Sequence, residues 1–260
     1  MRNSPMWKLS YYILGDLIKN RIILGYLLFL SVVGWGVFFL ESQPEKALLV
    51  LMQVALMAVP LIVMVFATIY YYNSREFILL ILTQPIARSA VIKSFFAGLS
   101  CAFILSFLIG IGLPLVLFYP SMESFYLIIS GLMLSLVFIA IALYVSIKVQ
   151  DKARGMGVVL LLWVFFAFLY DGFLIFFMYQ FSDYPIEEGV LVLTLFNPID
   201  IARITIIMKT EASAMMGLSG AVFREFFGSS KGVLVSLTIL VIWWVLPFVL
   251  AGKIFSKKDM

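Results

Sequence analysis

Six long runs of apolar residues determine what this chain can fold into. They cover residues 22–40, 47–71, 91–118, 125–147, 157–179 and 232–251. At about 1.5 Å per residue, a helix made from each run can cross the roughly 30 Å hydrocarbon core of a bilayer. Only helices satisfy their backbone hydrogen bonds within one segment in lipid, so the sequence predicts an all-α integral membrane protein with six transmembrane helices.

Composition agrees with this fold class and leaves little chain for anything else. The 260 residues are 64% hydrophobic and 12% charged, whereas soluble domains contain about 25% charged residues. We therefore expect residues 1–260 to form a single transmembrane domain, with no separate soluble domain. The 18 Lys and Arg against 14 Asp and Glu are too few and too dispersed to indicate nucleic-acid binding.

The positions of lysine and arginine predict the orientation in the membrane. If the amino terminus is cytoplasmic, most of the 18 basic residues fall in inner segments, and the two short outer loops contain only Lys46. Cytoplasmic loops carry the excess of basic residues in membrane proteins, so both termini are expected inside. The inner basic residues are Arg2, Lys8, Lys19, Arg21, Arg75, Arg88, Lys93, Lys148, Lys152, Arg154, Lys253, Lys257 and Lys258.

Residues 5–20, ahead of the first span, have two interpretations. Leu9, Ile13 and Leu17 recur among charged residues such as Asp16, which is the pattern of a short amphipathic helix lying in the membrane interface. We favour this interfacial helix. The alternative is that these residues are simply the charged start of the first span.

The first inner loop is apolar where a cytoplasmic loop should be polar. Its apolar run, residues 77–82, is too short to span the membrane and too hydrophobic to lie in water. A proline at position 85 ends the run, because the residue before proline is pushed out of the helical region. A helix over residues 75–83 either presents apolar side chains to another protein or packs against its own bundle or the lipid headgroups, and the residues leave both open.

The last outer segment, residues 180–231, contains a helix start. Asn197 provides a cap, Pro198 takes the first helical position, and Asp200 lies near the positive end of the helix dipole. Arg203 follows three residues later on the same face. The residues favour a well-capped surface helix, and the alternative is a site for a periplasmic partner or a gate.

Asp171 is an ionisable residue within the apolar run 157–179. A carboxylate at bilayer depth costs about 2.5 to 3.5 kcal/mol on insertion scales, so it should face protein or water. It lies roughly 20 Å above the inner end of its span, in the outer half. Gln53 in the second span has a similar depth and is a candidate hydrogen-bond partner, so Asp171, Tyr170 and Gln53 are the candidate intramembrane or translocation residues. The alternative is a protonated, structural carboxyl group.

Several activities lack the residues that they need. The chain has no histidine, and Cys101 is its single cysteine, so the usual serine or cysteine hydrolase would lack its base. An intramembrane aspartyl protease would need a second acid facing Asp171. No GxxxxGK[ST] phosphate loop occurs. We therefore expect a non-enzymatic subunit that holds no metal and no cofactor of its own.

Three motifs follow one another along the chain. They are Glu76-(x5)-Leu82-Thr83-Gln84-Pro85-Ile86-(x)-Arg88, then Leu169-Tyr170-Asp171, then Asn197-Pro198-(x)-Asp200-(x2)-Arg203. Together with the short first helix, the six spans and the long last outer segment, they resemble the type-2 (ABC-2, or type V exporter-like) permease subunits of ATP-binding-cassette transporters. The motifs are most similar to those of the permeases that serve nitrous oxide reductase maturation, and the resemblance covers the whole chain.

The resemblance implies partners and a task. It implies a homodimer in the bacterial inner membrane, bound to a cytoplasmic ABC ATPase that holds ATP and Mg²⁺, and to a periplasmic accessory protein such as a copper chaperone. Such a complex supports assembly of the copper–sulfur site of nitrous oxide reductase, by moving a sulfur species or by transmitting ATP-driven motion. Residues 75–83 would be the coupling helix, with ATPase-contact residues Arg75, Glu76, Phe77, Ile78, Leu79, Leu80, Leu82, Gln84, Pro85 and Arg88.

Two other functions remain open from the sequence. One is an ABC-2 permease that exports a lipid, drug or polysaccharide, or that serves surface motility. The other is a membrane scaffold that transports nothing. A scaffold predicts no ATPase partner and an inner loop that tolerates charged substitutions, so the loop at residues 75–83 separates the two classes.

Overall fold

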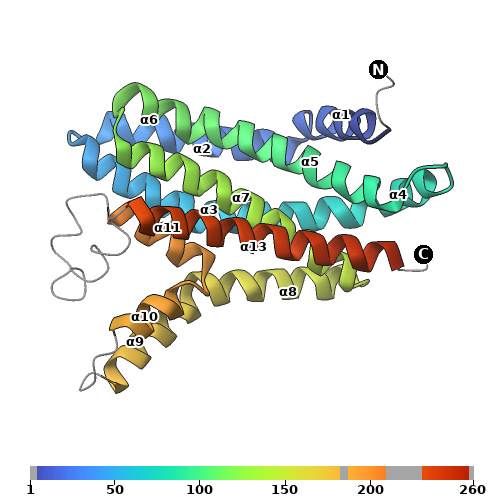
Figure 1. The fold of residues 1–260 in the computed structure, drawn as a ribbon. Coiled ribbons are helices and arrows are strands. Elements are labelled where there is room, and N and C mark those ends of the chain that lie inside the picture. Colours follow the sequence, from blue (N-terminus) through green and yellow to red (C-terminus); the bar gives the residue numbers. More distant parts are fainter. Residues whose placement is uncertain (1–4, 182–186, 209–229, 258–260) are drawn as a thin grey trace.

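The computed structural model describes residues 5–181, 187–208 and 230–257, and these residues form helices joined by short turns, without strands. Six helices are long and apolar enough to cross a membrane: Arg21–Leu40, Pro44–Asn73, Arg88–Phe118, Met122–Lys148, Lys152–Gln180 and Lys231–Lys257. The prediction of an all-α membrane protein with six spans is therefore confirmed. Figure 1 shows most of the spans running along a common direction, with both chain termini at one end.

Each apolar run of the sequence falls within one of these spans. The first two spans are α2 (Arg21–Leu40) and α3 (Pro44–Asn73), and the third joins α5 (Arg88–Phe107), η1 (Leu108–Gly112) and α6 (Leu113–Phe118). The fourth span is α7 (Met122–Lys148), and the sixth is α13 (Ser230–Lys257). The fifth span joins α8 (Lys152–Val164), η2 (Phe165–Leu169) and α9 (Tyr170–Gln180). The shorter helices are α1 (Pro5–Ile18), α4 (Arg75–Leu82), α10 (Glu187–Thr194) and α11 (Pro198–Ile207).

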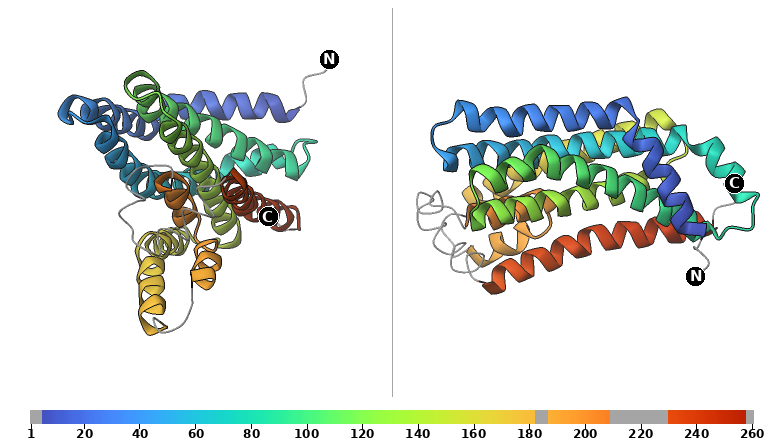
Figure 2. Two further views of the ribbon diagram at one scale, coloured as in Figure 1. Left: turned by 60° about the vertical axis from the view of Figure 1, so that its left-hand side comes forward. Right: turned by 90° about the horizontal axis from the view of Figure 1, so that it is seen from above.

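The first helix is separate from the first span. The chain leaves the helical conformation at residues 19–20, and the Asn20 side chain then caps α2 by accepting a hydrogen bond from the Ile22 amide at 2.9 Å. Figure 2 shows α1 running obliquely across the bundle, and Ile13 and Leu17 are buried there. The alternative that these residues merely begin the first span is wrong.

The fourth span, α7, forms the centre of the bundle. In its most apolar stretch 67% of the residues are buried, against 22% in α2, in the fifth span and in α13. It packs against α3, α5, α11 and α13, and Leu134 and Phe138 are completely buried. The less buried spans expose apolar side chains such as Leu28, Ile175 and Leu246, so they face lipid or another subunit.

Two glycines allow α2 to cross the third span in direct backbone contact. A Cβ atom on Gly34 would lie 2.0 Å from the carbonyl oxygen of Gly110 in η1. A Cβ atom on Gly110 would lie 2.5 Å from the Leu30 Cβ. Small residues permit this approach between membrane helices, so both positions require glycine for a steric reason.

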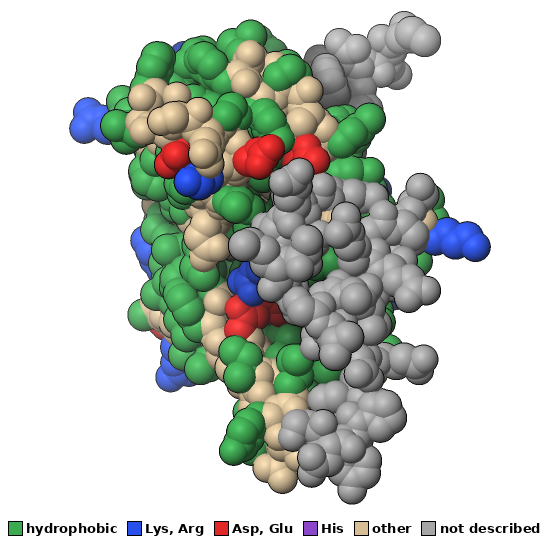
Figure 3. All heavy atoms as spheres, turned by 90° about the vertical axis from the view of Figure 1, so that its left-hand side faces the viewer, with side chains coloured by type: hydrophobic (Ala, Val, Ile, Leu, Met, Phe, Trp, Pro, Cys, Tyr) green, Lys and Arg blue, Asp and Glu red, His purple; other side chains and the backbone are tan. Residues whose placement is uncertain are grey.

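The two ends of the bundle differ in what they carry. We call the end with α1, α4 and the last turns of α13 the terminal end, and the end with the α2–α3 and α6–α7 turns the distal end (Figure 1). Figure 3 faces the distal end and shows acidic side chains among hydrophobic ones. Glu41, Glu45 and Glu123 lie in or beside those turns.

Candidate functional site

The fifth span bends immediately before Asp171. Its middle section, η2, is a π-helical turn, and Figure 1 shows α9 leaving the bundle at an angle to α8. Turns of this kind bend helices and often lie at functional sites. The bend places Asp171 in the first turn of α9, beside a helix from the segment that follows the span.

That neighbouring helix is α11, and it starts as the sequence predicts. The Asn197 side chain accepts a hydrogen bond from the Ile199 amide at 3.0 Å, and Pro198 occupies the first helical position. The expectation of a surface helix is wrong, however. Asn197 and Ile199 are completely buried, Asp200 is nearly so, and α11 packs against α7, α13 and α3.

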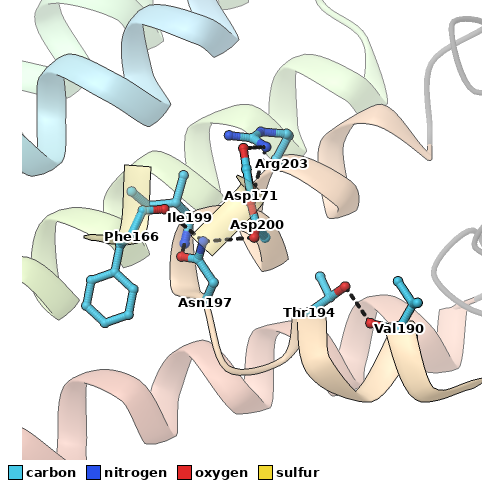
Figure 4. A network of polar contacts seen from close by, with 8 residues as sticks. All are labelled: Phe166, Asp171, Val190, Thr194, Asn197, Ile199, Asp200 and Arg203. Carbon is cyan, nitrogen blue, oxygen red and sulfur yellow. Dashed lines mark hydrogen bonds and ion pairs between the residues drawn. The ribbon is translucent and has the colours of Figure 1, made fainter. Parts of the chain in front are cut away.

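Four side chains form a polar network between the fifth span and α11, which we call the Asp171 cluster (Figure 4). Arg203 Nη1 lies 2.7 Å from Asp171 Oδ2 and 3.2 Å from Asp200 Oδ1. The contact with Asp171 is also a hydrogen bond. Asp200 Oδ1 accepts no hydrogen bond within the described residues, so its contact with Arg203 is an ion pair only. Asn197 Nδ2 donates to Asp200 Oδ2 and to the Phe166 carbonyl oxygen, both at 2.8 Å. The cluster thus links α11 to η2 as well as to α9.

The structure gives Asp171 a different partner from the one expected. Gln53 is exposed on α3 and forms no hydrogen bond with Asp171, whose carboxylate is held by Arg203. The sequence places Arg203 in the outer segment 180–231 and does not predict how deep it lies in the membrane. The pairing of Arg203 with Asp171 was therefore not predicted. One signal was available, because Arg203 is the only basic residue in the apolar stretch Pro198–Ile207.

Burial changes the acidity of Asp200. Burial, together with the hydrogen bonding and charge of the neighbouring Asp171, raises the pKa of Asp200 from 3.8 to about 7, although Arg203 and Asn197 favour the charged form. Among the described residues a single arginine faces the two carboxyl groups, so ionisation of both acids exceeds its positive charge by one. Burial therefore favours the protonated form of Asp200, the more buried of the two carboxyl groups.

The stability of the folded chain should decrease as pH rises from about 4 to about 7. The pKa of Asp200 is 3.8 before folding and about 7 after it, so the folded state binds more protons between these values. The stabilisation is complete below pH 3.8 and is lost as pH rises through 7. Thermal unfolding in detergent at several pH values measures the slope. Asp200→Asn should flatten it and Glu45→Gln, an exposed control, should not, and equal slopes in all three proteins would contradict the assignment.

Two further hydrogen bonds hold the chain that leads into α11. The Tyr170 hydroxyl donates to the Leu193 carbonyl oxygen, and Trp243 Nε1 donates to the Leu195 carbonyl oxygen at 3.2 Å. Tyr170, a candidate from the sequence, therefore positions α10 and α11 from the fifth span. Trp243 does so from α13 and was not among the sequence candidates.

At the terminal end, α4 has one buried and one exposed face. Ile78 and Ile81 are buried against the bundle, whereas Leu79 and Leu80 are 46% and 67% exposed. The face with Ile78 and Ile81 agrees with packing on the chain's own bundle, and the face with Leu79 and Leu80 is open to a partner protein or to lipid headgroups. Of the other candidate contact residues, Arg75, Glu76, Gln84, Pro85 and Arg88 are exposed, and Phe77 and Leu82 are partly buried.

Polar contacts connect α4 and the end of α3 to the base of the fifth span. Arg75 Nη1 donates to the Gln150 carbonyl oxygen at 3.0 Å, and Lys152 Nζ donates to Asn73 Oδ1 at 2.9 Å. The Tyr72 hydroxyl donates to the Val149 carbonyl oxygen at 2.8 Å. Sequence reasoning missed these contacts because their partners lie far apart in the chain. The fifth span is thus held at its base by these bonds and near its other end by Arg203.

Comparison with known proteins finds relatives over most of the chain. No protein-family model matches it. It is 26% identical over 287 aligned residues to a protein of Stutzerimonas stutzeri named "Probable ABC transporter permease protein NosY", an alignment that covers 98% of this chain and 99% of the relative. A Pseudomonas aeruginosa protein of the same name is 25% identical over 234 residues, covering 82% of this chain and 85% of the relative.

Proposed function

We propose, on the premise that this chain is a distant NosY-like permease subunit of an ABC transporter, that it supports assembly of the copper–sulfur site of nitrous oxide reductase. The names of the two relatives and the three sequence motifs support this task. In this proposal a separate ATPase subunit binds ATP and Mg²⁺ and hydrolyses the nucleotide. The permease carries the resulting motion across the membrane.

The fifth span is the element that would carry the motion. The observation on which the proposal rests is the 2.7 Å ion pair between Arg203 and Asp171, because it joins this span to α11. At the base of the span, Gln150 and Lys152 are bonded to Arg75 and Asn73. A displacement of α4 would therefore shift the base of α8 and alter the contact between Asp171 and Arg203.

The exposed residues suggest where each partner binds. The ATPase would bury Leu79 and Leu80, which lie exposed at the terminal end. That end would be cytoplasmic, since most basic residues of the connecting segments lie there. The periplasmic accessory protein would bind at the distal end, near α10 and α11, and a second copy of the chain would complete a homodimer in the inner membrane.

The chemistry of the Asp171 cluster favours transmitted motion over passage of a sulfur species. Two carboxyl groups and one guanidinium make a contact that can break and re-form. When both acids are ionised, the cluster carries one net negative charge, which would repel an anionic sulfur species. We therefore propose transmission of ATP-driven motion as the main mechanism, and transport of a sulfur species as the second candidate.

Deleting the gene for this chain tests the proposed task. The deletion strain should produce nitrous oxide reductase without its copper–sulfur site, and the tagged chain should restore the site and copurify with an ATPase in mild detergent. The absorption spectrum and copper content of the purified reductase are the measurements. A normal reductase in the deletion strain would contradict the maturation task and favour an exporter of lipid, drug or polysaccharide, and absence of any ATPase would favour a scaffold.

A further inference from the structure

A cavity opens between the start of α5 and the end of α13, at the terminal end of the bundle. Its volume is about 270 Å³. Lys93 from α5 and Lys253 from α13 lie on its wall, and Ile92 and Phe248 provide an apolar lining. The two helices thus build a pocket that is basic in one part and apolar in another.

Among residues 5–181, 187–208 and 230–257, none supplies a counter-charge to the basic part of this cavity. No Asp or Glu contributes to its lining, and within the described residues neither Lys93 nor Lys253 forms an ion pair. Ser89, one turn before Lys93 on α5, adds a hydroxyl group. Two ammonium groups and a hydroxyl are donors that suit a phosphate group.

The apolar part of the cavity is backed by aromatic rings. The Phe248 ring packs against Phe96 with a centroid distance of 4.5 Å, and Phe96 stacks on Trp244 at 5.7 Å. Along α13, Phe248 precedes Lys253 by more than one turn, so it lies deeper in the span than the lysine. The pocket is therefore polar toward the helix ends and apolar toward the middle of the membrane.

We propose that this cavity binds the phosphate headgroup of an anionic phospholipid from the leaflet at the terminal end. Basic pockets between membrane helices at this depth bind such headgroups. Lys93 and Lys253 hold the phosphate, and the side chains of Ile92 and Phe248 contact the glycerol and the first part of an acyl chain. The apolar lining distinguishes this ligand from a free phosphate ion, which would leave that lining without a partner. The inference does not depend on the maturation task.

Lipid titration of the purified full-length chain tests the site. Native mass spectrometry measures binding of phosphatidylglycerol, with phosphatidylcholine as the zwitterionic comparison and inorganic phosphate as the soluble competitor. Phosphatidylglycerol should bind in preference to phosphatidylcholine, and millimolar phosphate should not displace it. The double variant Lys93→Gln/Lys253→Gln should bind phosphatidylglycerol roughly 30-fold more weakly, since each basic residue near an anionic headgroup contributes about a factor of five.

Two further variants distinguish binding in this cavity from a general effect of removing positive charge. Gly252 lines the cavity, and a Cβ atom there would meet no atom within 4 Å, so Gly252→Leu should fill the cavity and weaken lipid binding while both lysines remain. Lys148→Gln removes a charge from the end of α7 outside the cavity, and binding should persist. Circular dichroism and size-exclusion chromatography confirm that each variant is folded.

Four results would overturn the proposal. Equal binding of the two lipids would remove the role of charge, and unchanged binding in the double lysine variant would place the lipid elsewhere. Displacement of lipid by millimolar phosphate would assign the cavity to a soluble phosphate. Loss of ATPase copurification in the double variant, with lipid binding intact, would assign the lysines to the ATPase contact.

Discussion

Replacing Leu79 by glutamate is expected to detach the chain from its ATPase while the bundle stays folded. Leu79 lies on the exposed face of α4, whereas Ile78 and Ile81 attach the helix to the bundle. Burying a leucine side chain contributes about 1.5 to 3 kcal/mol, and an unpaired carboxylate in the same contact costs more than that gain. Binding should therefore weaken at least a hundredfold, roughly. Copurification and titration of the permease with the purified ATPase measure the change.

A matched variant controls for the added charge. Met122 is 71% exposed at the distal end, so Met122→Glu introduces the same carboxylate away from α4 and should leave ATPase binding unchanged. Leu80→Glu, on the exposed face beside Leu79, should reproduce the loss. Unchanged copurification in the Leu79→Glu and Leu80→Glu variants would contradict the coupling-helix assignment and favour packing of this face in the lipid headgroups.

The spans could be predicted from the sequence because length and hydropathy alone specify a membrane helix. The start of α11 could also be predicted, since a cap depends on neighbouring residues such as Asn197 and Pro198. The burial of α11 could not. Its ten residues are too few to cross a bilayer, and the polar side chains of Asn197, Asp200 and Arg203 are typical of a surface helix. Only contacts with α7 and η2 reveal that these polar groups satisfy one another inside the bundle.

The orientation of α4 was undetermined for a related reason. Its residues 77–82 are all apolar, so no polar face indicates which side meets water or a partner. The packing of Ile78 and Ile81 on the bundle selects the face, and Leu79 and Leu80 are left exposed as a consequence. Helical spacing of three residues between the two isoleucines was present in the sequence, but the neighbouring leucines concealed it.

Replacing Asp171 by asparagine is expected to stop reductase maturation without loss of the ATPase. The change preserves the shape of the side chain and removes the charge that lies 2.7 Å from Arg203 Nη1. Hydrogen bonds to charged groups contribute about 1.5 to 3 kcal/mol, and partial exposure of Asp171 places this one near the lower limit. Motion arriving through α8 would then reach α11 without this charged contact, and only neutral hydrogen bonds such as those of Phe166 and Tyr170 would transmit it. The copper–sulfur content of the reductase and the ATP hydrolysis rate of the purified complex measure the two effects separately.

Combining this change with one in its partner shows whether the ion pair itself is required. If Asp171 and Arg203 act as one contact, the double variant Asp171→Asn/Arg203→Gln should mature the reductase no worse than either single variant, because coupled residues are not additive. Asp171→Glu keeps the charge and should retain part of the activity, and Glu45→Gln removes an exposed acid of the distal end and should have no effect. Normal maturation by Asp171→Asn would refute the transmission role. Loss of ATPase copurification in that variant would instead identify Asp171 as a structural residue of the fifth span.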